Sequence, residues 1–351
     1  MGFYYSLFFI LLLLALIGDS SLRNKTRGNN TAIYRIALLC ISTVLIVITS
    51  IRYEVGTDYT AYIEEAQYML KIPFKEAIFK YELFFVLFTK ISYGLFGTMQ
   101  FFYMVIAFVI IVPFALSINY MKESLFYVFL FFFVTTTFFI SLNAMRQIAA
   151  FSIAFYAFVK YLRTDNKKFF LAIIIATFWH TSALIYLSIY FLDKINLNRV
   201  YILVLVSFIV FKVILNQLMI SFIENTGLPL RYYFLAQEGS SSLMFIIISL
   251  IVFILFKFFV KRNDNKSNLF YNISLLNVGV AIFADGIPGA YRLMYIFYPF
   301  YCFICPYMIR NSRIKQKRIM AIVLFCLFAI YYYRQQILGN ANEIVPYKSI
   351  L

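Results

Sequence analysis

Long apolar runs separated by short polar segments extend along the whole chain. Each run approaches the length of a helix that crosses the ~30 Å of hydrocarbon in a bilayer. Backbone polar groups in a bilayer must be satisfied within the structure itself, so such runs predict transmembrane helices. We expect an all-α polytopic membrane protein of about twelve such helices, forming one integral membrane domain over residues 1–351. The predicted spans are about 3–18, 33–51, 82–96, 100–118, 124–141, 147–162, 169–192, 200–220, 242–260, 269–284, 292–309 and 319–337.

The long polar segment 52–81 carries a helical pattern of its own. Gly56 permits a tight turn, and Thr57 or Asp58 can cap the helix that follows. Apolar residues then recur at helical spacing, which predicts an amphipathic helix lying along the outer membrane surface. Either this helix is only interfacial, or Arg52 and Asp58 line the mouth of an outward cavity. The apolar stripe is Tyr59, Tyr62, Ile63, Ala66, Met69 and Leu70.

Composition agrees with a membrane protein. Hydrophobic residues make up 63% of the chain and charged residues 13%, with a mean hydropathy of +0.85. A soluble domain has roughly 25% charged residues, so this composition excludes a soluble globular protein, a disordered chain and a nucleic-acid-binding module. The net charge of +16 is then explained by basic cytoplasmic loops, and nucleic acid is not expected as a partner.

Basic segments also predict the orientation in the membrane, because Lys and Arg concentrate in cytoplasmic loops. The segments 19–31, 261–266 and 310–318 are all basic, and the span count puts them on one side. One segment disagrees. Residues 163–168 are also basic, yet the count puts them outside, and their side decides which face Arg146 sees. The segments expected outside are 52–81, 221–241, 285–291 and the tail after residue 338.

The scarcity of histidine and intramembrane acids narrows the chemistry. A single histidine excludes His-based zinc catalysis, and the Cys302/Cys305 pair has no further ligand nearby, so neither a metal nor a cofactor is expected. No acidic residue falls in the middle of a predicted span, where proton- or sodium-coupled transporters usually place one. This argues against a coupled transporter.

Two positions near apolar runs, Arg146 and His180, are candidates for chemistry. Arg146 would cost about 2.5–3.5 kcal/mol near the bilayer centre, so it must face a boundary, a partner or a wet cavity. It either snorkels to the interface or, with Asn143 and Gln147, forms a polar patch that holds a ligand oxygen. His180 is either hydrogen-bonded within the bundle or catalytic.

Arginines beside tyrosines mark two outer loops. Arg292 follows a Gly- and Pro-containing break, with Tyr291 and Tyr295 at helical spacing. Arginine over aromatic rings is suited to holding a pyrophosphate beside a sugar. Arg231, followed by two tyrosines, is a weaker version of the same pattern.

Four short motifs occur in order along the chain. They are Arg-Tyr-x-x-Gly-Thr-Asp-Tyr-x-x-Tyr at 52–62, Met-Arg-Gln-x-x-Ala at 145–150, Phe-x-His-x-Ser-Ala at 178–183 and Tyr-Arg-x-x-Tyr at 291–295. Together they resemble the EpsG branch of the Wzy-type polysaccharide polymerases. The resemblance implies a bacterial cytoplasmic-membrane glycosyltransferase that polymerises O-antigen, capsule or exopolysaccharide repeat units. Donor and acceptor would be oligosaccharides linked to undecaprenyl pyrophosphate, used on the outer face without a metal. A flippase and a chain-length regulator of the same pathway are implied as partners.

This reaction needs fixed cations for the leaving pyrophosphate and a base for the acceptor hydroxyl. Arg146 and Arg292, then Arg52, are expected as the cations. His180 is expected either to act as the base or to orient the acceptor, with Asp58 and Glu82 as alternative bases. The expected catalytic residues are Arg146, His180, Arg292 and Asp58. The expected substrate-binding residues are Arg52, Tyr59, Tyr62, Glu82, Asn143, Gln147, Ser182, Arg231, Tyr291 and Tyr295.

Two other functions fit the same sequence. A flippase of lipid-linked oligosaccharide would also use arginines and aromatic residues, but on both faces. A membrane acyltransferase that modifies surface glycans would use His180 as a base at a cytoplasmic funnel.

Overall fold

The computed structural model describes residues 1–23, 30–162, 164–226, 243–261, 265–287, 290–313, 317–341 and 343–350. Within these ranges every regular element is a helix, and strand-like pairing is confined to two isolated bridges, Arg52–Ser349 and Val260–Ser312. The chain forms two compact units, one of residues 1–187 and 329–351 and one of residues 188–328. That residues 1–351 act as one integral membrane domain stays a prediction.

Seven helical segments among the described residues are long and apolar enough to span a membrane, or eight if the bent α7–α8 pair is one span. The protein is therefore a multi-pass membrane protein, but the expected count of about twelve is not confirmed. The apolar run 82–96 forms only α5 (Leu83–Phe96), whose 14 residues reach about 21 Å at 1.5 Å per residue. The run 169–192 is broken into α10 (Asn166–Thr177), η1 (Thr181–Leu187) and α11 (Ser188–Leu192).

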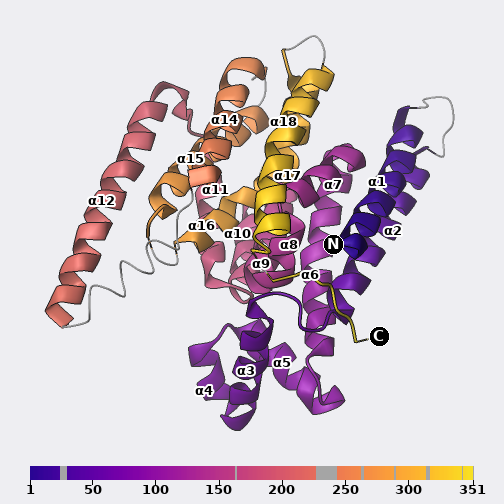
Figure 1. Ribbon diagram of the computed structural model, residues 1–351, viewed down its shortest axis with the longest axis vertical. Helices are drawn as coiled ribbons and strands as arrows, with labels where there is room; N and C mark the ends of the chain where they lie inside the picture. Colours follow the sequence, from indigo (N-terminus) through magenta and orange to yellow (C-terminus); the bar gives the residue numbers. More distant parts are fainter. Residues whose placement is uncertain are drawn as a thin grey trace. The chain divides into compact units, whose positions relative to one another are not determined.

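The first unit contains the candidate site, and its α-helices are labelled in Figure 1. Its helices up to α5 are α1 (Gly2–Arg23), α2 (Asn30–Ile51), α3 (Asp58–Lys71), α4 (Phe74–Lys80) and α5. They are followed by α6 (Gln100–Met121), α7 (Leu125–Val134), α8 (Thr137–Asn143), α9 (Met145–Tyr161), α10 and η1. The unit is completed by the end of α18 (Lys317–Tyr332), by η4 (Tyr333–Leu338) and by the C-terminal segment 343–350.

Polar contacts define two ends of this unit. At the Asp19 end, the Asp19 carboxylate accepts hydrogen bonds from Ser124 and from the first backbone N–H groups of α7. The hydroxyl of Tyr34 donates to the carbonyl of Glu123 at the same end. The end of α1, the start of α2, the end of α6 and the start of α7 therefore meet here. At the opposite Arg52 end, the guanidinium of Arg52 reaches Met145 at the start of α9.

α5 stays at the Arg52 end instead of crossing to the other one. Its first turn packs Phe85 against Phe102 of α6, and near its other end Ser92 accepts the backbone N–H of Phe102. α6 therefore starts at the Arg52 end and runs to the Asp19 end, and α9 starts at the same end and packs along α6. The span count that put residues 163–168 outside treated 82–96 as a crossing, which α5 does not make, and the side of the membrane on which residues 163–168 lie stays open. Lys167 and Lys168 follow α9 at the Asp19 end, whereas Arg146 lies with the first long loop.

The C-terminal segment 343–350 lies along the loop that follows α2. Backbone hydrogen bonds join Tyr53 N–H to the Lys348 carbonyl and Ile350 N–H to the Ile51 carbonyl, both at 3.0 Å. The Lys348 ammonium pairs with Glu54 at 2.7 Å. These contacts clamp the loop that carries Arg52.

The second unit is built around buried asparagines and one ion pair. Asn272 donates to the carbonyls of Leu192 and Ile195, and so satisfies backbone groups where α11 ends. Lys212 pairs with Asp285 at 3.2 Å. Besides α11, the elements are η2 (Leu197–Arg199), α12 (Tyr201–Thr226), α14 (Leu243–Phe259), α15 (Asn265–Ala284), α16 (Tyr291–Phe297), η3 (Tyr298–Phe300), α17 (Tyr301–Asn311) and the start of α18.

Candidate functional site

Asn143 fixes the start of α3. Its side-chain oxygen accepts hydrogen bonds from the Thr57 hydroxyl at 2.9 Å and from the Asp58 backbone N–H at 2.8 Å. Thr57 does not cap the helix with its own side chain, so the cap comes from a residue far along the chain. Gly56 has φ +102°, and a Cβ there would lie 3.2 Å from the Leu142 carbonyl oxygen, which explains the glycine. Asn143 thus ties α3 to the α8–α9 junction, directly before Arg146.

Part of the predicted stripe of α3 faces protein, whereas Leu70 is exposed and Ile63 is half-buried. Tyr59, Tyr62, Ala66 and Met69 are its buried residues, and α3 packs against α5. The chain is helical over Asp58–Lys71, but the expected amphipathic helix on an outer membrane surface is not confirmed and stays a prediction.

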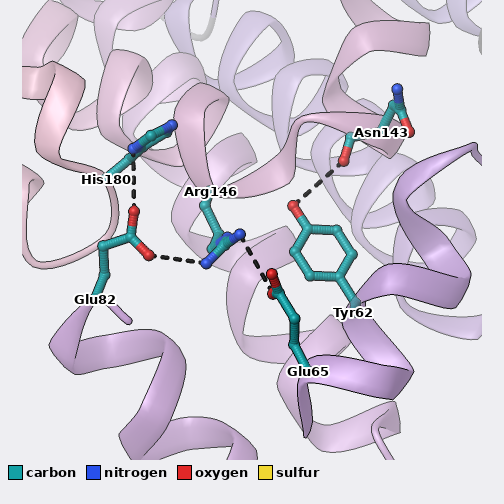
Figure 2. Close-up of polar contacts among 6 residues, drawn as sticks. All are labelled: Tyr62, Glu65, Glu82, Asn143, Arg146 and His180. Carbon is teal, nitrogen blue, oxygen red and sulfur yellow. Dashed lines mark hydrogen bonds and ion pairs between the residues drawn. The ribbon is translucent and has the colours of Figure 1, made fainter. Parts of the chain in front are cut away.

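Four charged or titratable side chains, one of them on α3, lie close together (Figure 2). The Arg146 guanidinium contacts Glu82 through Nη1 at 2.8 Å and Glu65 through Nη2 at 3.5 Å. The other oxygen of Glu82 lies 3.1 Å from Nδ1 of His180. Glu82 therefore bridges an arginine and a histidine, and we call Glu65, Glu82, Arg146 and His180 the charge cluster.

Aromatic rings hold the arginine of this cluster in place. The Arg146 guanidinium lies 4.3 Å from the ring centre of Phe85 and 5.3 Å from that of Tyr62, which is cation–π range. The hydroxyl of Tyr62 donates to the Asn143 carbonyl at 3.4 Å (Figure 2). The side chains of Arg146 and Glu82 are 20% and 13% exposed, and that of His180 is 30% exposed. The cluster is enclosed, with its histidine the most accessible of these three groups.

Charge balance in the cluster alters the expected role of Arg146. Two carboxylates contact one guanidinium, so its positive charge is already compensated and a pyrophosphate bound there would meet two negative groups. Burial raises the pKa of the Glu82 carboxyl, but the His180 contact and the charge of Arg146 lower it by more, so its pKa lies below its ordinary value. Glu82 is therefore an anion at neutral pH. Glu82 is better suited to orient His180 than to accept a proton itself.

One ring nitrogen of His180 contacts a carboxylate, and the other ring nitrogen points away from it. Nδ1 faces Glu82, while the other ring nitrogen points away from the carboxylate (Figure 2). Among the described residues, the ion-pair contact of the imidazole is the one that Nδ1 makes with Glu82. A carboxylate behind one imidazole nitrogen fixes the tautomer and leaves the other nitrogen able to take a proton.

Arg52 does not line an open cavity mouth, which was one of the two alternatives for this segment. It is fully buried, donates to the Val55 carbonyl at 3.2 Å and to the Met145 sulfur at 2.7 Å. Its guanidinium lies 4.8 Å from the ring centre of Tyr103 and 5.7 Å from that of Tyr59. It therefore braces the loop after α2 against α6 and α9, and direct contact with a substrate would require this loop to move.

The remaining predicted residues are dispersed. Gln147 is buried in α9, and the Ser182 hydroxyl is buried just after His180. Arg292, Tyr291 and Tyr295 open α16 in the second unit, with the two tyrosine rings edge to face at 6.0 Å. Asp58 begins α3, one turn before Tyr62. Arg231 lies outside the described residues.

Sequence reasoning missed Glu65 and Phe85, which both touch Arg146. Glu65 had one usable signal, since Asp58, Tyr62 and Glu65 are spaced i, i+4 and i+7 and so share one face of α3. No group of three or more His, Cys, Asp or Glu side chains able to hold a metal is found within the described ranges.

Fold and cluster together define a class: a helical multi-pass membrane protein with an enclosed carboxylate–histidine pair braced by an arginine. The chain belongs to the EpsG family, whose family model matches residues 35–349 and so covers nearly its whole length. No curated protein and no solved structure matches this chain. Family membership points to a polysaccharide-polymerase-like membrane protein.

Proposed function

We propose that this protein is a glycosyltransferase that polymerises oligosaccharide repeat units linked to undecaprenyl pyrophosphate on the outer face of the bacterial cytoplasmic membrane. The observation that carries the proposal is the charge cluster. Arg146 and His180 come from two of the four motifs that resemble EpsG polymerases, and Tyr62, from a third, packs on Arg146. O-antigen, capsule and exopolysaccharide are the product classes.

The chemistry assigned to the cluster is general-base catalysis. Nε2 of His180 takes the proton of the acceptor hydroxyl as its oxygen bonds to the anomeric carbon of the donor. The bond between that carbon and the pyrophosphate oxygen breaks, and the carrier pyrophosphate leaves with the electron pair. Glu82 holds Nδ1–H and stabilises the imidazolium that forms.

Arg146 acts in this proposal as a positioning residue. It fixes Glu82 from the side opposite His180 and is itself held by Glu65 and the Phe85 ring. The leaving pyrophosphate then needs cations other than Arg146. Neither a metal nor a nucleotide sugar takes part in the proposed reaction.

Complementation of a deletion strain tests the proposal. The surface glycan is profiled in a strain that lacks this chain and carries the wild type, His180→Ala or Thr181→Ala at matched membrane abundance. Thr181 is the exposed neighbour of His180 and serves as the control. We expect single repeat units in the deletion strain and with His180→Ala, and long chains with the other two.

Two outcomes would reject the proposal. Lipid-linked units that accumulate on the inner leaflet of the deletion strain would identify a flippase. Chains of normal length that lack an acyl group would identify a membrane acyltransferase.

A further inference from the structure

The helix α4, which follows α3, exposes nearly all of its apolar residues. Among its seven residues only Ala77 is buried. Phe79 is 81% exposed, and Phe74 and Ile78 are exposed as well. Such a cluster of large apolar side chains on an extramembrane element marks a contact surface. Unlike the buried part of the α3 stripe, this surface is not covered by protein within the described part of the chain.

Charge indicates what covers this surface. The segment 70–80 carries three lysines, Lys71, Lys75 and Lys80, against the single acid Glu76. Lys80 is engaged by Glu76 and by the Tyr68 hydroxyl, and Lys71 and Lys75 are exposed. Phenylalanines beside lysines on a short helix are typical of an element that lies in a membrane interface with anionic headgroups.

The surrounding elements are continuous with a lipid-facing surface. Five exposed residues recur every fourth position along α6, a candidate span: Met104, Phe108, Val112, Leu116 and Tyr120. At the Arg52 end this stripe continues into α5, because the exposed Phe96 stacks on Phe101 at 5.3 Å. Lys90 of α5 in turn donates to the Ile72 carbonyl just before α4, at 2.9 Å. The apolar surface of α4 thus adjoins helices that face lipid.

We propose that α4 is an interfacial helix that lies in the membrane surface at the Arg52 end. Phe74, Ile78 and Phe79 enter the boundary between headgroups and acyl chains, and the lysines contact anionic lipid headgroups. Only Tyr81 separates α4 from Glu82 of the charge cluster. The helix therefore brings the bilayer surface beside the cluster, and a lipid-linked substrate reaches it laterally from the membrane. This entry role rests on the proposed function.

The depth of Phe79 is the direct test of the interfacial position. The full chain is reconstituted in bilayers of phosphatidylcholine and phosphatidylglycerol with Phe79→Trp, and with Tyr53→Trp, in the exposed loop after α2, as the control. Trp179, the one native tryptophan, is buried, and its signal is subtracted using the parent. We expect lipids brominated near the top of the acyl chain to quench residue 79 and aqueous iodide to quench residue 53. Iodide quenching of residue 79 without bromine quenching overturns the proposal.

The entry role has a kinetic test. Lys75→Glu is compared with Lys122→Glu, which makes the same charge change at the Asp19 end of α6. One basic residue near an anionic surface changes an affinity about fivefold. We therefore expect Lys75→Glu to raise the KM for extracted lipid-linked repeat units at least about fivefold with kcat unchanged, and Lys122→Glu to leave both unchanged.

The two proposals can fail separately. Bromine quenching with no change in KM leaves the interfacial position standing and overturns lateral entry. A parent protein that does not elongate repeat units refutes the proposed function, while the quenching result, which needs no turnover, still decides where α4 lies.

Discussion

Glu65 and Glu82 contact the same arginine, and replacing each in turn separates charge compensation from catalysis. At an effective dielectric constant of about 20, Coulomb's law gives about 6 kcal/mol for a 2.8 Å pair and about 5 kcal/mol for a 3.5 Å pair. Those distances are the contacts of Glu82 and Glu65 with Arg146. The two carboxylates are therefore almost equal in their Coulomb attraction to Arg146. Only Glu82 of the two hydrogen-bonds the guanidinium, so Glu82→Gln should destabilise the protein somewhat more than Glu65→Gln.

Only Glu82 also contacts His180, at 3.1 Å. If Glu82 orients the base, Glu82→Gln loses most of the general-base contribution, about 10²-fold or more in kcat, and Glu65→Gln loses about tenfold or less. Initial elongation rates of both variants are measured in proteoliposomes with lipid-linked repeat units extracted from the deletion strain, with melting temperatures measured in parallel. Equal losses of kcat in the two variants would refute the reasoning, because both carboxylates would then serve only to neutralise Arg146.

Three further measurements probe other parts of the structure. The contacts of Glu82 hold the pKa of its carboxyl below the ordinary 4.5. The stabilisation from this carboxylate is therefore present above pH 4.5 and is lost as the pH falls through the lowered pKa. The difference in melting temperature between the wild type and Glu82→Gln should be constant from pH 5 to 8 and shrink in more acid solution. Gly56→Ala places a Cβ at positive φ and should lower the free energy of unfolding by about 1–3 kcal/mol and abolish elongation. Gly94→Ala, in open space on α5, should be neutral or slightly stabilising. Unfolding of both variants in detergent checks this, and an unchanged stability of Gly56→Ala would contradict it. Lys212→Met and Asp285→Asn each remove the 3.2 Å ion pair and should lower stability by about 1 kcal/mol, and the double variant should lose less than the sum of the two. An additive double variant would show that the pair is not coupled.

The sequence predicted the start of α3 and several residues of the site, because both depend on local pattern and motif order. Gly56 and Asp58 mark a turn and a helix start in any context. Arg146 and His180 stood out since each is costly in an apolar segment. These two residues meet in the structure through Glu82.

Tertiary pairing could not be predicted from the same pattern. The run 82–96 is as apolar as a spanning helix, and its location at one end depends on packing against α3 and α6. Glu65 has no local feature that identifies Arg146 as its partner. The motif that contains Arg52 suggested a cavity mouth. In the structure the Arg52 guanidinium contacts two tyrosine rings and a backbone carbonyl, which the fold brings together and a local sequence pattern does not reveal.

The pairing of the C-terminal segment with the loop after α2 has a consequence for biosynthesis. Lys348 and Glu54, which form an ion pair, are 294 residues apart in the chain. During translation the loop that carries Arg52 emerges long before the segment that clamps it, and domains fold as the chain is made. α1, α2 and α6 can be inserted in the membrane while the loop is still unclamped. Assembly of the Arg52 loop therefore waits for residues 343–350, and a chain released before they are made would occupy the membrane with this loop unclamped.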